Sequence, residues 1–228
     1  MDAETWLNNK YSKDRRHEVK EKKICCLQFN LTHSLKLKGF INLITLEIEN
    51  QKIIHLSLNE CTKLKELYCS GNDQLQTLEI NNLTKLILLK CANNKLKDLD
   101  ISQLEKLKEC ECEDNQLTCL KLGYHPNLRN LICSDNEITE INLNSLINEE
   151  PKIEYLDLSN NNFSRQNISI FEDLISLEVL MINDNSFYGS LAVLLEKLAE
   201  LYIINISNTN VNCLDYKKEK SSDLLLYL

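Results

Sequence analysis

Glycine and proline are scarce in this chain of 228 residues, which contains only four Gly and two Pro. Few Gly argue against folds built on glycine-rich phosphate-binding loops, and neither G-x-G-x-x-G nor G-x-x-x-x-G-K occurs. Basic charge is also in the minority, with 26 Lys and Arg against 34 Asp and Glu and a formal net charge of −8. Because nucleic-acid binding depends on clustered Lys and Arg that neutralise phosphates, we do not expect nucleic acid as the main partner.

Long apolar runs are missing as well. The longest, such as residues 86–89 and 224–228, are far shorter than the ~20 residues of a membrane-spanning helix. The first twenty residues are polar and charged, without the apolar segment of a secretory signal. We therefore expect a cytoplasmic protein without a membrane partner. In the cytosol, its 10 Cys should be reduced thiols rather than disulfides.

Leu and Asn dominate instead, with 43 and 28 copies, and they recur in one eleven-residue pattern, L-x-x-L-x-L-x-x-N-x-L. Cys often replaces Leu at position 6 of this pattern, as in Leu86, Leu89, Cys91, Asn94 and Leu96. Copies start at residues 43, 64, 86, 107, 128, 153, 177 and 201. The first and last are weaker, with Gln51 and Thr209 at the Asn position. Such a regular period is the signature of a repeat architecture.

The pattern has a direct physical reading. Apolar positions 4 and 6 alternate with polar positions 3 and 5, which is typical of a half-buried strand, so stacked repeats should form a parallel sheet. The Asn amide at position 9 can bond backbone groups where the chain leaves the strand. Repeats of 21–22 residues leave room only for extended or 3₁₀ returns, whereas residues 190–200 in a longer repeat predict a helix. The Asn side chains that should stack into a buried ladder are Asn72, Asn94, Asn115, Asn136, Asn161 and Asn185.

This pattern resembles the leucine-rich repeat (LRR) family over about residues 24–211. The resemblance implies an α/β repeat fold: a curved, right-handed LRR solenoid with a parallel β-sheet on its concave face and short helices or 3₁₀ turns on its convex face. A narrower resemblance rests on the Cys-bearing repeats L-x-x-L-x-C-S-x-N and on the stretches D-A-E-T-W-L, S-L-K-L-K-G-F, F-Y-G-S-L and I-S-N-T-N. Together these look like the expanded intracellular LRR proteins of arbuscular mycorrhizal fungi. No kinase motif is present, so the resemblance implies an interaction role rather than an activity.

We expect three segments along the chain. Residues 1–23 should form an N-terminal helical cap, in which Trp6, Leu7 and Tyr11 cover the first repeat. Residues 24–211 should form a solenoid of about eight or nine repeats, starting with a degenerate copy. Residues 212–228 should be a C-terminal cap or a truncated tail, because five nearly continuous apolar residues at 224–228 should not remain in water. The basic run 10–23 is either a solvated face or a contact for an acidic partner.

Cysteine is the first candidate for chemistry. Cys69, Cys91, Cys112 and Cys133 all occupy position 6, on the inward side, where Cys packs well as a small apolar residue. The densest trio, Cys110, Cys112 and Cys119, has no identifiable fourth ligand for zinc. The four His share no spacing, and His33, which lies between Thr32 and Ser34, has no identifiable acid partner. We therefore expect no catalytic residue, no cofactor and no metal.

The outward positions supply candidate partner-binding residues. An acidic group consists of Glu109, Glu111 and Glu113, with Asp114 and Asp135 nearby. It either attracts a basic partner or holds Ca²⁺, although a flat sheet offers poor encirclement for a cation that takes 6–8 oxygen ligands. An apolar group lies in the later repeats, with Asp157 among the charged residues around it. An apolar centre within a polar rim is typical of a protein-binding hot spot. The members of the apolar group are Ile132, Tyr155, Val179, Met181, Tyr202 and Ile203.

The sequence therefore favours a monomeric, non-enzymatic scaffold in signalling that binds a protein partner on the concave face. The partner should carry basic groups around an apolar anchor. Two other functions stay open: an adaptor or substrate-recognition subunit of a ubiquitin-ligase or kinase assembly, and an enzyme that uses the acidic patch. A further alternative is that the C-terminal tail folds over the last strand and hides Ile203.

Overall fold

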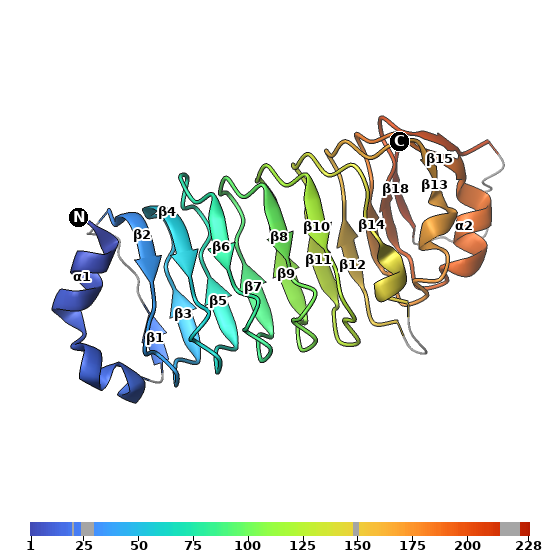
Figure 1. Ribbon diagram of the computed structural model, residues 1–228. Coiled ribbons are helices and arrows are strands. Elements are labelled where there is room, and N and C mark those ends of the chain that lie inside the picture. The colour runs from blue at the N-terminus through green and yellow to red at the C-terminus, as the bar shows by residue number, and fades with distance from the viewer. Residues whose placement is uncertain (20, 24–29, 148–150, 215–223) are drawn as a thin grey trace.

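The computed structural model describes residues 1–19, 21–23, 30–147, 151–214 and 224–228, and in this part the chain winds into a solenoid (Figure 1). Each turn contributes one short strand to a ten-stranded sheet in which neighbouring strands are parallel. This large sheet confirms the predicted solenoid. In spatial order its strands are β1 (Glu21–Lys23), β3 (Thr45–Glu47), β5 (Glu66–Tyr68), β7 (Leu88–Lys90), β9 (Glu109–Glu111), β11 (Asn130–Ile132), β12 (Tyr155–Asp157), β14 (Val179–Met181), β16 (Ile203–Asn205) and β18 (Leu225–Tyr227).

The predicted alternation explains these strands. The central residue of β7, β9 and β11 is Leu89, Cys110 and Leu131, each fully buried, while its two neighbours in the strand are half-buried on the outer side. Side chains in a strand point alternately to opposite faces, so position 4 fills the core and positions 3 and 5 form the outer surface of the sheet. We call this outer surface the sheet face.

The return segments are mostly extended, as the short repeats predict. They form three small parallel sheets opposite the large one: β2-β4-β6, β8-β10 and β13-β15-β17. Their strands are β2 (Thr32–Lys36), β4 (Lys52–Ser57), β6 (Thr77–Glu79), β8 (Asp98–Asp100), β10 (Cys119–Lys121), β13 (Gln166–Asn167), β15 (Phe187–Ser190) and β17 (Asn210–Asn212). Later repeats add the 3₁₀ helices η2 (Leu143–Ser145) and η3 (Ile168–Phe171) and the helix α2 (Leu191–Lys197). Helix α2 confirms the helix predicted at 190–200, and the side chain of Ser190 caps its N-terminus.

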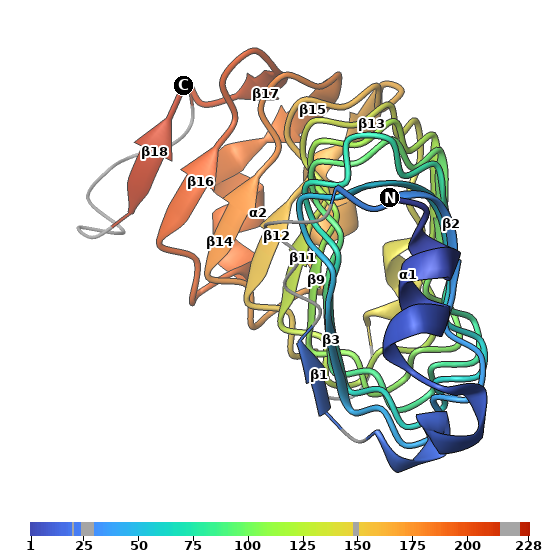
Figure 2. The same ribbon diagram turned by 90° about the vertical axis from the view of Figure 1, so that its left-hand side faces the viewer.

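Two helical pieces lie across the N-terminal end of the solenoid, α1 (Ala3–Lys10) and η1 (Lys13–Glu18) (Figure 2). Helix α1 buries Trp6 and Leu7 against the core that includes Leu35 of β2. Tyr11 packs against the same core. Residues 21–23, which the sequence placed with the cap, form β1 and pair with β3. The predicted boundaries of the cap (1–23), the solenoid (24–211) and the C-terminal segment (212–228) stay predictions.

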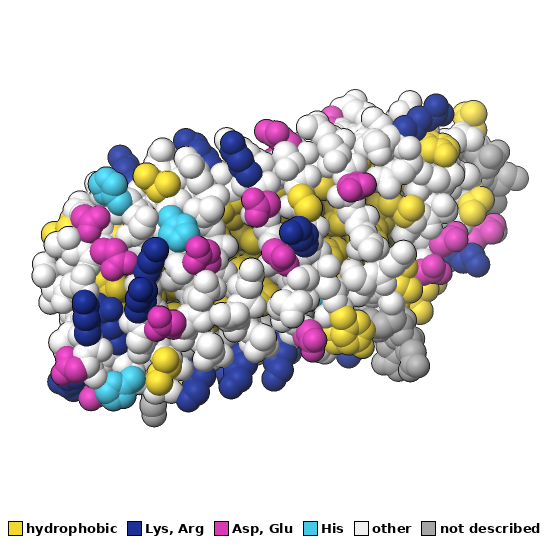
Figure 3. All heavy atoms as spheres, viewed as in Figure 1, with side chains coloured by type: hydrophobic (Ala, Val, Ile, Leu, Met, Phe, Trp, Pro, Cys, Tyr) yellow, Lys and Arg dark blue, Asp and Glu magenta, His cyan; other side chains and the backbone are white. Residues whose placement is uncertain are grey.

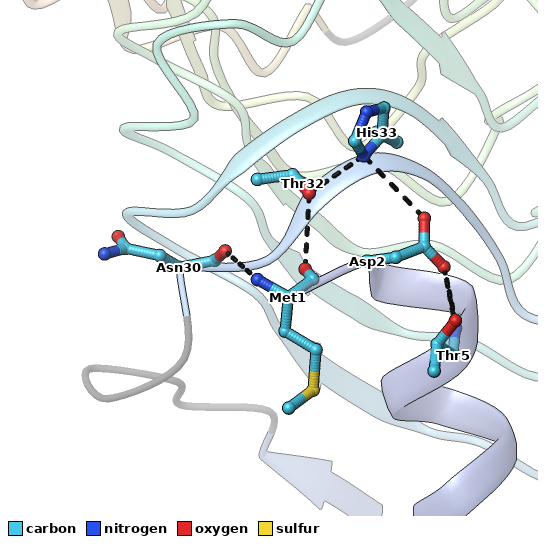
Figure 4. A network of polar contacts seen from close by, with 6 residues as sticks. All are labelled: Met1, Asp2, Thr5, Asn30, Thr32 and His33. Atoms are coloured by element: carbon cyan, nitrogen blue, oxygen red, sulfur yellow. Dashed lines mark hydrogen bonds and ion pairs between the residues drawn. The ribbon is translucent and has the colours of Figure 1, made fainter.

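Polar contacts tie the first residues to β2 (Figure 4). Asp2 caps helix α1, because its carboxylate accepts hydrogen bonds from both the backbone N–H and the hydroxyl of Thr5, each at 2.9 Å. The backbone N–H of Thr32 donates to the carbonyl of Met1 at 3.0 Å, and the amino group of Met1 donates to the carbonyl of Asn30 at 3.2 Å. The N-terminus thereby extends the small sheet by one bridge between Asp2 and Thr32.

The C-terminal residues extend the large sheet. Strand β18 pairs in parallel with β16, with Leu225 opposite Ile203 and Tyr227 opposite Asn205. Among the described residues, the tail therefore lies beside the last repeat strand and not over it. The alternative that residues 224–228 cover Ile203 is wrong.

The Asn ladder is present and joins each repeat to the one before it. Asn136 is buried, and its side-chain oxygen accepts a 2.9 Å hydrogen bond from the backbone N–H of Leu117 in the preceding repeat. Its side-chain nitrogen donates to the carbonyl of Cys112 in that repeat and to those of Cys133 and Ser134 in its own. The same reach into the preceding repeat occurs at Asn72, Asn94, Asn115, Asn161 and Asn185. Asn115 is half-buried rather than buried as predicted, whereas the others are buried.

The residue before each ladder position adopts a left-handed backbone conformation. Its φ angle is +52° at Asp114 and +54° at Asp135, a region that Gly, Asn and Asp tolerate best. The repeat starting at 64 has Gly71 there, with φ +71°. Position 8 of the pattern therefore accepts only this residue class, and the full set is Asn50, Gly71, Asn93, Asp114, Asp135, Asn160, Asp184 and Asn208.

Cys69, Cys91, Cys112 and Cys133 are fully buried in the core, as position 6 predicts. Burial raises the pKa of the Cys69, Cys91 and Cys133 thiols well above the ordinary value; at Cys112 a contact with the Cys110 side chain is the larger cause and burial the second. Such thiols stay protonated and unreactive at neutral pH. Within the described ranges, no group of three or more His, Cys, Asp and Glu side chains is placed to hold a metal ion.

We expect these four thiols to resist alkylation in the native protein, while the exposed Cys119 on β10 reacts quickly. Iodoacetamide labelling, resolved by peptide mass spectrometry, checks this, and unfolding in denaturant should release the four sites together. Native labelling of the four at the rate of Cys119 would show that they are not core residues. Cys112→Ser should cost on the order of 1–3 kcal/mol, because it buries a hydroxyl in an apolar setting.

A helix able to cross a membrane would have to be long and apolar, and none occurs in the part of the chain that the structure describes. The longer of the two α-helices there, α1, has eight residues.

Candidate functional site: the sheet face of the later repeats

The strand register arranges the sheet face in two rows, because residues at the same repeat position lie opposite each other. Position 3 forms the row Tyr155, Val179, Ile203 and Leu225, which is apolar across four adjacent strands. Cross-strand neighbours of this kind have Cβ atoms about 5 Å apart, so their side chains contact one another. We call these four residues the apolar row.

Position 5 forms a mixed row beside it. Here Ile132, Asp157 and Met181 follow one another on β11, β12 and β14, and Asn205 and Tyr227 continue the row. Met181 lies on the same strand as Val179 and widens the apolar area, whereas Asp157 separates Met181 from Ile132. The structure thus places Met181 beside the apolar row and leaves Ile132 at the margin of this apolar area.

Exposure differs among the predicted contact residues. Val179 is only 6% exposed, so its side chain packs between its neighbours and adds little accessible apolar surface. Tyr155, Met181 and Ile203 are half-buried on the sheet face. Tyr202 is exposed just before β16, at the end of the sheet where the chain enters the strands. The accessible apolar area therefore comes mainly from Tyr155, Met181, Ile203 and the β18 side chains.

Glu109 and Glu111 lie on β9, next to β11 and two strands from Tyr155. Glu111 forms an ion pair with Lys90 of the preceding repeat, with 2.7 Å between the Lys90 Nζ and a carboxylate oxygen. Hydrogen bonding to Glu111 raises the pKa of Lys90. The predicted acidic group is therefore partly neutralised at Glu111, whereas Glu109 has no ion pair within the described ranges.

The remaining carboxylates lie where the chain leaves the strands: Glu113 follows β9, Asp135 follows β11 and Asp157 ends β12. Burial, then the charges of Glu111, Asp114 and Asp157, raises the pKa of Glu113, and one of its carboxylate oxygens is buried without a hydrogen-bond partner in the described structure. Burial, then Asp114 and Asp157, likewise raises the pKa of Asp135. None of Glu113, Asp135 and Asp157 forms a salt bridge with a described cation. This edge of the apolar row therefore carries uncompensated negative charge.

The face opposite the sheet face has no apolar row of this kind among the described strands. Figure 3 shows it over the small sheets, where side chains of both charges are scattered among neutral ones. Its exposed apolar side chains include Ile54 of β4 and Tyr124 after β10, which are 41% and 58% exposed. These two residues are useful references for exposed apolar side chains outside the sheet face.

Sequence reasoning missed the contribution of Leu225 and Tyr227, which are 54% and 51% exposed on β18. A signal was available: Leu226 follows Ile204 by 22 residues (226 − 204), the spacing of the shorter repeats, and the structure places the two opposite each other. The repeat pattern did not identify this strand, because the Asn position of such a copy would fall after Leu228.

A comparison with protein-family models gave no match, and neither did a comparison with curated proteins. Solved structures do match. The functional domain of InlJ from Listeria monocytogenes, described as including a cysteine ladder, aligns with a TM-score of 0.63 and 19% identity over 94% of this chain. This chain spans only 54% of that domain. Internalin C2 from the same organism aligns with a TM-score of 0.62 and 20% identity, covering 96% of this chain and 83% of that one.

A plant protein is similar as well. The LRR ectodomain of the membrane receptor kinase GASSHO1/SCHENGEN3 from Arabidopsis thaliana, solved in complex with CASPARIAN STRIP INTEGRITY FACTOR 2, has a TM-score of 0.58 and 24% identity. The alignment covers 80% of this chain and 26% of the ectodomain. The narrower resemblance to fungal proteins stays a prediction. The repeat pattern, the stacked strands and these structural similarities together establish that the chain has the leucine-rich repeat fold.

Proposed function

We propose that this chain is a non-catalytic protein-binding module that contacts its partner with the sheet face of the later repeats. The apolar row is the observation that carries the proposal. Most outward residues of a solvated sheet are polar, yet Tyr155, Val179, Ile203 and Leu225 lie side by side with Met181 next to them. Contiguous apolar groups of this kind on a protein surface mark interaction sites.

Charge supports a partner with basic groups around an apolar anchor. The carboxylates of Glu113, Asp135 and Asp157 lie at one edge of the apolar row without a described cationic partner. Burial is the main cause of the raised pKa of Glu113 and Asp135, and neighbouring carboxylates add to it. A Lys or Arg from a partner would relieve this repulsion between carboxylates. The fold is consistent with this role, since the plant ectodomain was solved in complex with another molecule.

The test combines Tyr155→Ala with Met181→Ala. We expect binding to weaken about five-fold per residue, or about 1 kcal/mol each, because large side chains near the centre of an interface contribute most of its energy. The free energy of unfolding should fall by about 1 kcal/mol or less per change, since both side chains are half-buried. Affinity capture from cytosol with quantitative mass spectrometry identifies the partner, and calorimetry with the purified partner measures the dissociation constant.

The matched control is Ile54→Ala with Tyr124→Ala, which removes one aliphatic and one aromatic side chain away from the sheet face. This pair should leave the dissociation constant unchanged. Equal weakening by both pairs, or unchanged binding by the Tyr155 and Met181 pair, would place the interface elsewhere.

A further inference from the structure

A pocket of about 360 Å³ lies at the other end of the molecule, between the N-terminal helical pieces and β2. Four cationic side chains line it, together with a single carboxylate, that of Glu4. This is unusual in a protein whose formal net charge is −8. The lining residues are Glu4, Asn8, Lys13, Arg16, Ser34, Lys36 and Lys38.

Arg16 is the buried cation of this pocket, with only 4% of its surface exposed. Its guanidinium donates to the side-chain oxygen of Asn8 at 2.7 Å and to the carbonyls of Tyr11 and Lys38 at 3.3 Å each. All three acceptors are neutral, and none of the described carboxylates forms an ion pair with Arg16. A guanidinium has five N–H donors, so donors remain after these three bonds. Because a buried charge is costly without a counter-charge, an anion in the pocket would stabilise it.

Three lysines complete the cationic lining. Lys36 ends β2 and Lys38 follows it, on either side of the buried Leu37. Both lysine side chains therefore point away from the core, and both line the pocket beside the cap. Lys13 begins η1 on the other wall. Within the described ranges, none of the three forms a salt bridge. Glu4 is engaged by the backbone, because its carboxylate accepts a 2.6 Å hydrogen bond from the N–H of Lys36.

We propose that this pocket binds a phosphate group. Four cations against one carboxylate leave a local excess of three positive charges, which matches a dianion better than a single carboxylate. A phosphate also offers several acceptor oxygens to the spare donors of Arg16 and to the lysine ammonium groups. Figure 3 shows dark blue side chains at the end of the molecule that carries α1 and β2, with magenta carboxylates of the surrounding surface among them.

The test uses the full chain and two probes at constant ionic strength, inorganic phosphate and a short phosphoserine peptide, with sodium chloride as the reference. Nuclear magnetic resonance titration follows the backbone amides of Lys36 and Gly39. We expect a saturable, single-site shift with at least one phosphate probe and none with chloride. Inorganic phosphate binding points to the free anion, and binding of the peptide alone points to a phosphorylated side chain; either result supports the proposal.

Lys36→Gln with Lys38→Gln should weaken binding at least ten-fold. Lys85→Gln with Lys106→Gln is the matched control, since it removes the same charge from exposed lysines of the solenoid and should leave binding unchanged. Circular dichroism verifies that both variants fold, and Arg16 is left unchanged because it also holds the cap. The proposal is wrong if neither probe saturates, or if both lysine pairs weaken binding equally.

Discussion

Asn136→Leu should lower the free energy of unfolding by about 3 kcal/mol. The substitution leaves the backbone N–H of Leu117 without its acceptor and removes a donor from the carbonyls of Cys112, Cys133 and Ser134. An unsatisfied buried polar group costs roughly 1–3 kcal/mol, and leucine cannot replace either half of the amide. Urea unfolding monitored by circular dichroism measures the change.

Asn81 provides the reference for this experiment, because it is exposed in the segment between two repeats. Asn81→Leu should change the free energy of unfolding by about 0.5 kcal/mol or less. Asn115→Leu should resemble Asn136→Leu, since its amide makes the same contacts one repeat earlier, to Leu96, Cys91 and Cys112. If Asn81→Leu and Asn136→Leu cost the same, the ladder does not stabilise the fold as we infer.

Gly123→Ala should destabilise the protein by about 3 kcal/mol or more. A Cβ atom on Gly123 would lie 2.0 Å from the carbonyl oxygen of Ser102, which is a backbone atom of the preceding repeat. The contact is close to the paired strands β8 and β10, where the N–H of Ile101 donates to the carbonyl of Lys121 at 3.1 Å. The atoms in the way belong to the backbone of Ser102, so no side-chain rotation can make room for the new methyl group. The two repeats would have to separate locally.

Thermal and urea unfolding of Gly123→Ala measure this effect. Tyr124→Ala, which changes the next residue of the same loop, is the reference, because Tyr124 is 58% exposed and should tolerate truncation. A loss below about 1 kcal/mol for Gly123→Ala would mean that the loop moves away from Ser102 at little cost.

Much of the fold could be predicted because one local pattern repeats. The alternation around Cys110 and Leu131 predicts strands with a buried centre, and Asn at position 9 predicts the ladder, since both depend only on neighbouring residues in a repeat. Position 8 carries a further signal that was not used in the prediction: only Asn, Asp and Gly occur there in the eight copies, and these residues tolerate a left-handed backbone best. The apolar row was predicted through Ile203, because equal repeat positions become neighbours across strands.

Other features depend on how separate segments of the chain pack together, which the repeat pattern does not specify. The close approach of Gly123 to Ser102 depends on the path of two adjacent return segments, and nothing in the local sequence reports it. The neutral acceptors around Arg16 come from α1, the segment after it and the residues after β2, so the pocket exists only once the cap docks. Burial of Val179 likewise depends on the neighbouring side chains of its row.

The reach of each ladder amide has a consequence for how this protein can change in length. Asn94 bonds the carbonyl of Cys69 one repeat back and Asn115 bonds that of Cys91, so each amide connects only adjacent repeats and needs the same backbone groups from its neighbour. Gain or loss of one whole unit of 21 or 22 residues would therefore recreate the same junction, whereas a change of a few residues would break it. Duplication of complete units is thus the route by which such a chain can lengthen its surface while every internal junction stays satisfied.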